Sequence, residues 1–323
     1  MKKIHLIVLL GIFCFSFSSL TFALETETHK AINEYIATNA LNNFSLDSYL
    51  KNQLGFTNGI KEEFTSNKTK KAWEWVQFGG EYEDIPYWWM PYLRSVNHFH
   101  NPLTKLGFTG IWGTGTLSGV SSLEWSQEFS ETQSPGGFYS WYDVRRYFYK
   151  ALTSVDKPTR DQNFADTFRG LGQVMHLVED LSVPEHTRDD GHYFFYMYED
   201  WAKTNITINT LPNYPPIFDP NLLKSPSQFA FNDVPIANLF DTRQYEGSNP
   251  NPDITLESNI GLSEYTNANF LSPDTMFSSN FPYPNWSSIV LYDWTDPSTG
   301  KKTTYLRKLG KGEVGSSGQI GNG

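Results

Sequence analysis

The sequence predicts a mainly α-helical protein with a small β-hairpin near its C-terminus. Three observations predict this class: a helix-period apolar pattern over 161–181, further helical patterns on both sides of it, and two strand-like runs joined by a turn. We expect a helical body over 24–280 and the hairpin over 281–309. The glycine-rich tail, 310–323, has no core-forming residues and is expected to be disordered.

The first 23 residues are expected to be a signal peptide. A positive start is followed by an apolar core over 4–17, and Ala23 ends a stretch that resembles a cleavage site. Cleavage would leave Leu24 as the N-terminus and would remove Cys14, the only cysteine. The protein is therefore predicted to be secreted or periplasmic, and any metal must be bound by His, Asp, Glu or a backbone group.

The composition of the processed chain bears on its partners. Loss of two leader lysines lowers Lys plus Arg from 25 to 23 against 35 Asp plus Glu, so the net charge falls from −10 to −12. An acidic surface does not attract polyphosphates at long range, which disfavours nucleic acid. The chain is rich in aromatic residues, which indicates either a core of large rings or an exposed rim for lipid, with 87–89 (Tyr-Trp-Trp) the best candidate for transient membrane contact.

The helical body is expected to contain several helices. In 28–41 four apolar residues lie on one stripe and His29 points toward the same buried face; 68–78 should stop at the Gly79-Gly80 pair. The strongest pattern is 161–181, where large apolar residues alternate at spacings of four and three. The expected helices are 28–41, 68–78, 141–152, 161–181, 194–203 and 260–271.

Two further segments break the helical pattern. Eight prolines within 205–253 interrupt every candidate helix, so we expect a long irregular insertion there. Runs at 287–294 and 301–306 alternate like strands, and 296–300 (Asp-Pro-Ser-Thr-Gly) supplies the turn of a hairpin.

The most informative motif is His176-x3-Asp180-x5-His186, which ends the best predicted helix. Residues four apart share one face of a helix, so His176 and Asp180 can reach one cation together. A carboxylate has a second oxygen that can bridge to a neighbouring cation. His186 follows Pro184, which stops the helix, and can serve a further site.

The remaining histidines of the processed chain are scarce, and several stand in ligand-like segments. Asp84 precedes His98 by fourteen residues, and His98 begins a His-Phe-His-Asn-Pro segment. His100, in the same segment, is either a hydrogen-bond donor behind a ligand or a surface residue. The six histidines of the processed chain are 29, 98, 100, 176, 186 and 192.

This series of residues resembles the zinc-dependent phospholipase C and single-strand nuclease superfamily, whose members are all-helical and hold three clustered zinc ions. The resemblance covers segments between 24 and about 203, and the His-x3-Asp-x5-His run is its most specific part. It implies one zinc on Asp84, His98, His176 and Asp180. Asp180 would bridge to a second zinc, completed by His29 and by the α-amino group and carbonyl of Leu24.

The third zinc site of that superfamily is where this chain departs from the pattern. The resemblance implies His186 and Glu199 as ligands, but the histidine expected four residues before Glu199 is replaced by Phe195. His192 is a possible substitute, although two helical turns, ~10 Å, would separate it from Glu199 if the segment were helical. We therefore expect two zinc ions and a third site that is weakened or lost.

The function that follows from this resemblance is a secreted zinc-dependent phosphodiesterase like phospholipase C. A hydroxide held between two metal ions would attack phosphorus, with Asp84 orienting or deprotonating the water. A single-strand nuclease of the same superfamily is the alternative enzyme. The third possibility, favoured by Phe195, is a zinc-binding surface protein without catalysis.

Overall fold

The protein is described from a computed structural model, and the description covers 24–41, 43–84, 92–129, 133–134, 136–192, 197–213, 236–248, 254–255 and 258–322. It is mainly helical, with 46% helix and 10% strand, and has a two-stranded antiparallel sheet near the C-terminus. This confirms the predicted class. Within the described residues, no helix combines the length and the apolar character needed to cross a bilayer.

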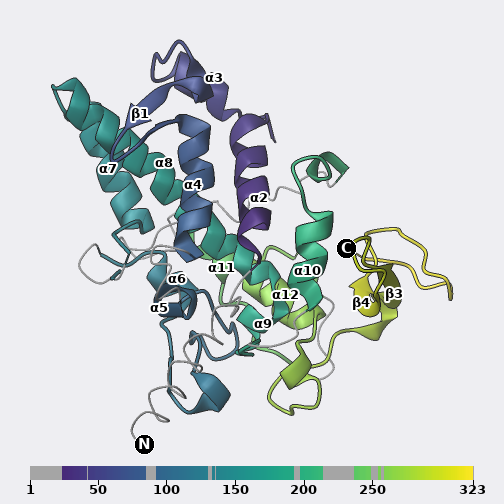
Figure 1. The fold of residues 1–323 in the computed structure, drawn as a ribbon. Helices are drawn as coiled ribbons and strands as arrows, with labels where there is room; N and C mark the ends of the chain where they lie inside the picture. Colours follow the sequence, from purple (N-terminus) through teal and green to yellow (C-terminus); the bar gives the residue numbers. More distant parts are fainter. Residues whose placement is uncertain are drawn as a thin grey trace, which may run out of the picture.

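Four long helices pack side by side in the upper left of the view in Figure 1. They are α2 (Thr26–Thr38), α4 (Ala72–Asp84), α7 (Trp141–Thr153) and α8 (Lys157–Glu179). Helix α8 packs against α4 and α7, and α4 also packs against α2. Aromatic rings fill the space between them, because Trp75, Phe64 and Phe164 are all buried in one apolar cluster.

Helix α4 differs from its prediction because its glycines lie at a helix crossing. The predicted stop at Gly79 is wrong: the helix continues to Asp84, and Gly79 lies against Gly172 of α8. A Cβ atom at Gly79 would lie 2.0 Å from the carbonyl oxygen of Arg169. The start is also later than predicted, since 69–71 forms strand β2 (Thr69–Lys71), which pairs with β1 (Glu63–Thr65).

Helix α2 buries a different face from the one predicted. Ile36 is one of the four apolar residues of 28–41 that were expected to face the core, but it is 42% exposed. The residues of this helix that face the interior are Thr28, His29, Asn33 and Ala37. Most of this inner face is polar, so a count of apolar residues could not find it. The predicted burial of His29 is confirmed.

Helix α8 begins at Lys157, four residues earlier than predicted, because Asp156 caps it by accepting a hydrogen bond from the backbone N–H of Thr159. It ends at Glu179 and passes through η3 (Asp180–Ser182) into α9 (Pro184–Thr187). The other helical elements are short: α3 (Leu46–Asn52), η1 (Gly59–Lys61), α5 (Tyr92–Ser95), η2 (Ile111–Gly113), α6 (Ser122–Trp125), α10 (Met197–Asn205), η4 (Leu211–Asn213), α11 (Ala237–Phe240), α12 (Leu262–Asn269), η6 (Pro273–Thr275) and η7 (Trp286–Ser288).

Much of the proline-rich segment, 214–235 and 249–253, lies outside the described residues. The predicted C-terminal hairpin is present: β3 (Ile289–Thr295) pairs with β4 (Lys302–Lys308), in register from Ile289↔Lys308 to Thr295↔Lys302. The tail beyond it differs from the expected disorder. It forms a bridge between Val314 and Ile320, and Glu313, next to that bridge, makes an exposed ion pair with Arg307.

Candidate metal centre

The candidate site forms where three helix ends meet. Asp84 is the last residue of α4, and Asp180 directly follows the last residue of α8. His176 lies in the last turn of α8, and His29 lies in the first turns of α2. The C-terminal end of a helix carries partial negative charge, so the ends of α4 and α8 both favour a cation at this point.

Asp180 lies at the centre of the site, and its carboxylate faces imidazoles on both sides. Its Oδ1 is 3.2 Å from His29 Nε2. Its Oδ2 is 2.7 Å from His98 Nδ1, 3.2 Å from His176 Nε2 and 3.8 Å from His186 Nδ1. All five side chains are fully buried. The two oxygens of the Asp180 carboxylate thus face different imidazoles, Oδ1 the ring of His29 and Oδ2 the other three rings.

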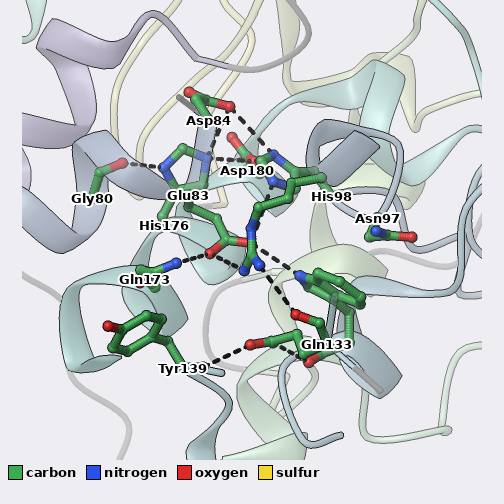
Figure 2. A network of polar contacts seen from close by, with 12 residues as sticks. Gly80, Glu83, Asp84, Asn97, His98, Gln133, Tyr139, Gln173, His176 and Asp180 are labelled. Atoms are coloured by element: carbon green, nitrogen blue, oxygen red, sulfur yellow. Dashed lines mark hydrogen bonds and ion pairs between the residues drawn. The ribbon is translucent and has the colours of Figure 1, made fainter. Parts of the chain in front are cut away.

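Asp84 closes the site on one side (Figure 2). Its Oδ1 lies 3.6 Å from His176 Nε2 and 3.7 Å from His98 Nδ1. The Asp84 side chain is 16% exposed, unlike the other members, so it marks the edge that solvent can reach.

Two groups of these residues could each hold a metal ion: His29 with His176 and Asp180, and Asp84 with His98 and His176. Within each group the ligand atoms lie within 4.8 Å of one another. His176 belongs to both groups. His176 Nε2 and His98 Nδ1 both face Asp180 Oδ2, which favours assignment of His176 to the group that contains Asp84 and His98.

The unsatisfied polar atoms of the site fit a metal better than a hydrogen-bond network. Within the described residues, His29 Nε2, His98 Nδ1, His176 Nε2 and both Asp180 oxygens are buried and make no hydrogen bond, despite the short distances between them. Buried polar atoms almost always have a partner. Two ligands on one tetrahedral ion with bonds of about 2.0–2.1 Å lie about 3.3 Å apart, close to the separations found here. The residues therefore fit a bound metal ion.

The electrostatics of the site also favour positive charge. Burial alone would lower the pKa of His29, but Asp180 and Glu179 outweigh it and raise the pKa to about 10. In His98 the same opposition, with Asp180 as the main partner, raises the pKa to about 9. The pKa of Asp180 is held well below its usual range by the surrounding histidines, against the effect of burial. Positive charge, as protons or as metal, is thus favoured at this carboxylate.

The outer nitrogens of the same rings are directed away from the centre. His29 Nδ1 donates to Glu179 Oε2 at 2.6 Å, and His176 Nδ1 donates to the carbonyl oxygen of Gly80 at 2.7 Å. His98 Nε2 faces Glu83 Oε1 at 3.8 Å. A hydrogen bond at one ring nitrogen leaves the lone pair on the other, which is the arrangement found around metal-binding histidines.

Glu83 is held in place by a buried network that Figure 2 shows beneath the site. Arg94 donates two hydrogen bonds of 2.7 Å to its carboxylate oxygens. Trp125 Nε1 donates at 2.9 Å, and Gln173 Nε2 donates at 2.5 Å. Sequence reasoning missed Glu83, Arg94 and Gln173, although the pairing of Glu83 with Asp84 repeats that of Glu179 with Asp180.

The residues of the predicted third site also come together. His192 Nε2 donates to Glu199 Oε1 at 3.0 Å, and the His186 and His192 rings lie 5.1 Å apart. The separation of ~10 Å along a helix therefore does not keep these two side chains apart. Phe195 lies outside the described residues, as does the aromatic stretch 87–89.

Leu24 is buried next to the segment that carries the site. Its side chain packs with Val183, three residues after Asp180, and with Ala202 of α10. This places the start of the expected processed chain beside the α8–α9 connection. Its role as a metal ligand stays a prediction.

His100 is a buried crosslink and not a surface residue. Its Nδ1 lies 2.7 Å from Ser121 Oγ, its Nε2 lies 2.9 Å from Asp241 Oδ2, and its backbone N–H donates to the carbonyl oxygen of His186. Ser121 Oγ also accepts from the backbone of Leu123 at the start of α6. The backbone hydrogen bond from His100 to His186 therefore connects the His98 segment to the His186 segment. The spacing of residues in the sequence gave no sign that Asp241 would contact His100.

Two surface cavities lie apart from the cluster. One, of about 490 Å³, is lined by polar residues including Lys61, Glu62 and Asp161. The other, of about 330 Å³, is lined by residues including Leu103 and Phe281. Neither cavity includes any member of the cluster.

Comparison with known proteins gives no family to this chain. No protein-family model, curated protein or solved structure matches it.

Proposed function

We propose that the protein is a zinc-dependent phosphodiesterase that acts like phospholipase C. The observation that carries this proposal is Asp180: a fully buried carboxylate whose two oxygens face different imidazoles without hydrogen-bond geometry. A carboxylate shared in this way is suited to bridge two divalent ions, which is the arrangement of two-metal phosphoesterases. The ligand spacing that resembles the zinc-dependent phospholipase C and nuclease superfamily supports the same conclusion.

The donor set supports zinc over calcium and magnesium. Four imidazoles and two carboxylates surround the centre, and calcium and magnesium prefer sites built from oxygen alone. Zinc binds imidazole nitrogen and carboxylate oxygen readily, in tetrahedral geometry. Asp84, His98, His176 and Asp180 would hold one ion, and His29, Asp180 and the N-terminal group of Leu24 a second. When bound, the ions supply Lewis acidity toward water and phosphoryl oxygens.

Asp84 is the residue we assign to proton handling. Its carboxylate is the most exposed in the cluster and stands at the solvent-facing edge. From there it can accept a hydrogen bond from an incoming water and take its proton as the water attacks phosphorus. The buried histidines around Asp180 have no such access, so they act as ligands only.

The substrate we favour is a phospholipid. The acidic chain gives no long-range attraction for a nucleic acid, whereas a single phosphodiester needs only local charge. Export by the leader would bring the enzyme to extracellular or periplasmic lipids. The contact between His192 and Glu199, beside His186, supports a third ion on these residues, and the zinc content reports whether it binds.

The test uses the processed protein, whose N-terminal residue is identified by mass spectrometry. Its zinc content is measured, and hydrolysis of phosphatidylcholine vesicles is compared with hydrolysis of single-stranded DNA. We expect at least two zinc ions per chain and faster release of the lipid head group. Faster cleavage of DNA would show that the substrate is nucleic acid and not phospholipid. Bound zinc without hydrolysis of either substrate would support a non-catalytic zinc-binding protein.

The variant that probes the bridging carboxylate is Asp180→Asn. It should lose both zinc and activity by orders of magnitude, because an amide offers only one oxygen ligand and no charge. The matched control is Asp293→Asn, the same change at an exposed position of β3. Full zinc content and full turnover in Asp180→Asn would contradict the proposal.

A further inference from the structure

Two pairs of consecutive acidic residues stand at the metal centre, Glu83-Asp84 at the end of α4 and Glu179-Asp180 at the end of α8. In each pair the aspartate faces the centre. We infer that the two glutamates are positioning residues, each of which fixes one histidine of the centre from behind: Glu179 fixes His29 and Glu83 fixes His98. The inference rests on the proposed metal binding.

Helix geometry explains why the two members of a pair have different roles. Successive residues on an α-helix point about 100° apart, because a turn holds 3.6 residues. An aspartate aimed at the centre therefore has its preceding glutamate directed to the side. At both helix ends that side is occupied by the outer nitrogen of a histidine from another segment.

Glu179 gives the clearer case. Its Oε2 lies 2.6 Å from His29 Nδ1, between residues 150 positions apart, and its side chain is 10% exposed. With Nδ1 donating to this carboxylate, Nε2 of His29 keeps its lone pair toward Asp180 Oδ1. The His29 ring stacks on the His176 ring at 3.5 Å, which sets its plane, but stacking does not select which nitrogen carries the proton. Glu179 makes that selection.

Glu83 occupies the equivalent place behind His98. Arg94, Trp125 and Gln173 hold its carboxylate, and its Oε1 lies 3.8 Å from His98 Nε2 while His98 Nδ1 faces Asp180 (Figure 2). The distance is longer than a hydrogen bond, so its effect on His98 is electrostatic. Because each glutamate serves a different histidine, the two metal sites can be weakened separately.

The experiment compares Glu179→Ala with Glu179→Gln, since the glutamine keeps an acceptor oxygen. Zinc affinities are measured by competition with a chromogenic chelator, and the thermal midpoint of the metal-free protein is measured by circular dichroism. We expect Glu179→Ala to weaken one zinc site about 10- to 100-fold and to leave the other unchanged. Glu179→Gln should recover part of that loss, with no change in the metal-free midpoint.

A double-mutant cycle with His29→Ala separates positioning from direct ligation. Glu179 Oε1 has no hydrogen-bond partner within the described residues, so direct contact with the metal is the competing role. If Glu179 acts through His29, Glu179→Ala has no further effect on zinc affinity once His29 is alanine. A further loss in that background would make Glu179 a ligand and overturn the inference.

Two more outcomes also count against the inference. A lower midpoint of metal-free Glu179→Ala with unchanged zinc affinities would make the residue structural only. A wild-type protein that binds no zinc would overturn the proposed function itself, and is recognised before any variant is made. For the second pair, Glu83→Gln removes the carboxylate that neutralises the buried Arg94. Glu83→Gln/Arg94→Met is therefore compared with Arg94→Met, and only the variant without Glu83 should weaken the His98 site.

Discussion

Single buried charges in this protein are stabilised by several partners, and Asp241 shows this outside the metal centre. Its carboxylate accepts from His100 at 2.9 Å, from Lys105 Nζ at 3.0 Å and from the backbone N–H of Arg243 at 2.6 Å. The Lys105 side chain is 41% exposed, whereas Asp241 and His100 are buried. Burial alone would raise the pKa of Asp241, but these donors outweigh it and lower the pKa to about 2.

This pKa predicts how stability depends on acid. The folded pKa lies below the unfolded value of about 3.9, so the contribution of Asp241 is complete above pH 4 and is lost as the pH falls toward 2. Its size is about 2–3 kcal/mol, since each unit by which the folded and unfolded pKa values differ corresponds to about 1.4 kcal/mol. In Asp241→Asn the free energy of unfolding should fall less steeply than in wild type between pH 4 and 2, as measured by urea titration. Equal slopes in the two proteins would contradict this account.

Single residues also show which parts of the site a sequence can reveal. His176 and Asp180 were predicted because their spacing of four places them on one side of a helix. His29 was predicted to be buried from helix periodicity, but its assignment to the site came only from the resemblance. His100 and Asp241 meet across 141 positions, and nothing in either segment specifies the partner. The repeated Glu-Asp pairs were visible in the sequence, but their meaning depends on which histidine stands behind each glutamate.

The pair of helices α4 and α8 positions the centre, and its close crossing depends on glycine. A Cβ atom at Gly172 would lie 2.0 Å from the carbonyl oxygen of Val76. Periodicity predicted α8, because its apolar residues face one way. It failed for α4, because glycine usually weakens a helix and its use for close approach depends on a neighbour distant in sequence.

We therefore predict that Gly172→Ala forces α4 away from α8. The cost should be about 1–3 kcal/mol of unfolding free energy, as for other overpacked sites. Zinc affinity should also fall, because Asp84 belongs to α4 and His176 belongs to α8, so a shift between the helices moves these two residues apart. Gly310→Ala is the control, because its nearest neighbour, Glu313 Oε2, lies at an ordinary 3.7 Å and its change should stay within about 0.5 kcal/mol. An unchanged urea midpoint in Gly172→Ala would contradict this prediction, because it would show that the helix crossing accommodates the added methyl group.

The metal centre joins segments from most of the helical body. Its members come from α2, α4, the His98 loop, α8 and α9, and the contact of His192 with Glu199 extends it to α10. A site assembled from such distant segments forms only when the whole body is folded, so we expect metal binding to be coupled to folding. This also explains why composition and periodicity could predict a mainly helical class, whereas the packing around the centre needed coordinates.

Removal of the metal should destabilise the entire molecule. A ligand that binds only the folded state stabilises it by about 2.7 kcal/mol at a hundred times its dissociation constant. For a chain of about 300 residues that corresponds to a rise in the thermal midpoint of about 4 °C. We expect chelation to lower the midpoint by this amount, zinc to restore it and magnesium to leave it low, because the centre is rich in imidazole. In Asp180→Asn the thermal midpoint should already be low, and zinc should not raise it. If neither chelator nor zinc changes the thermal midpoint of the wild-type protein, the charges of the buried carboxylates are balanced by protonated imidazoles alone and no metal is bound.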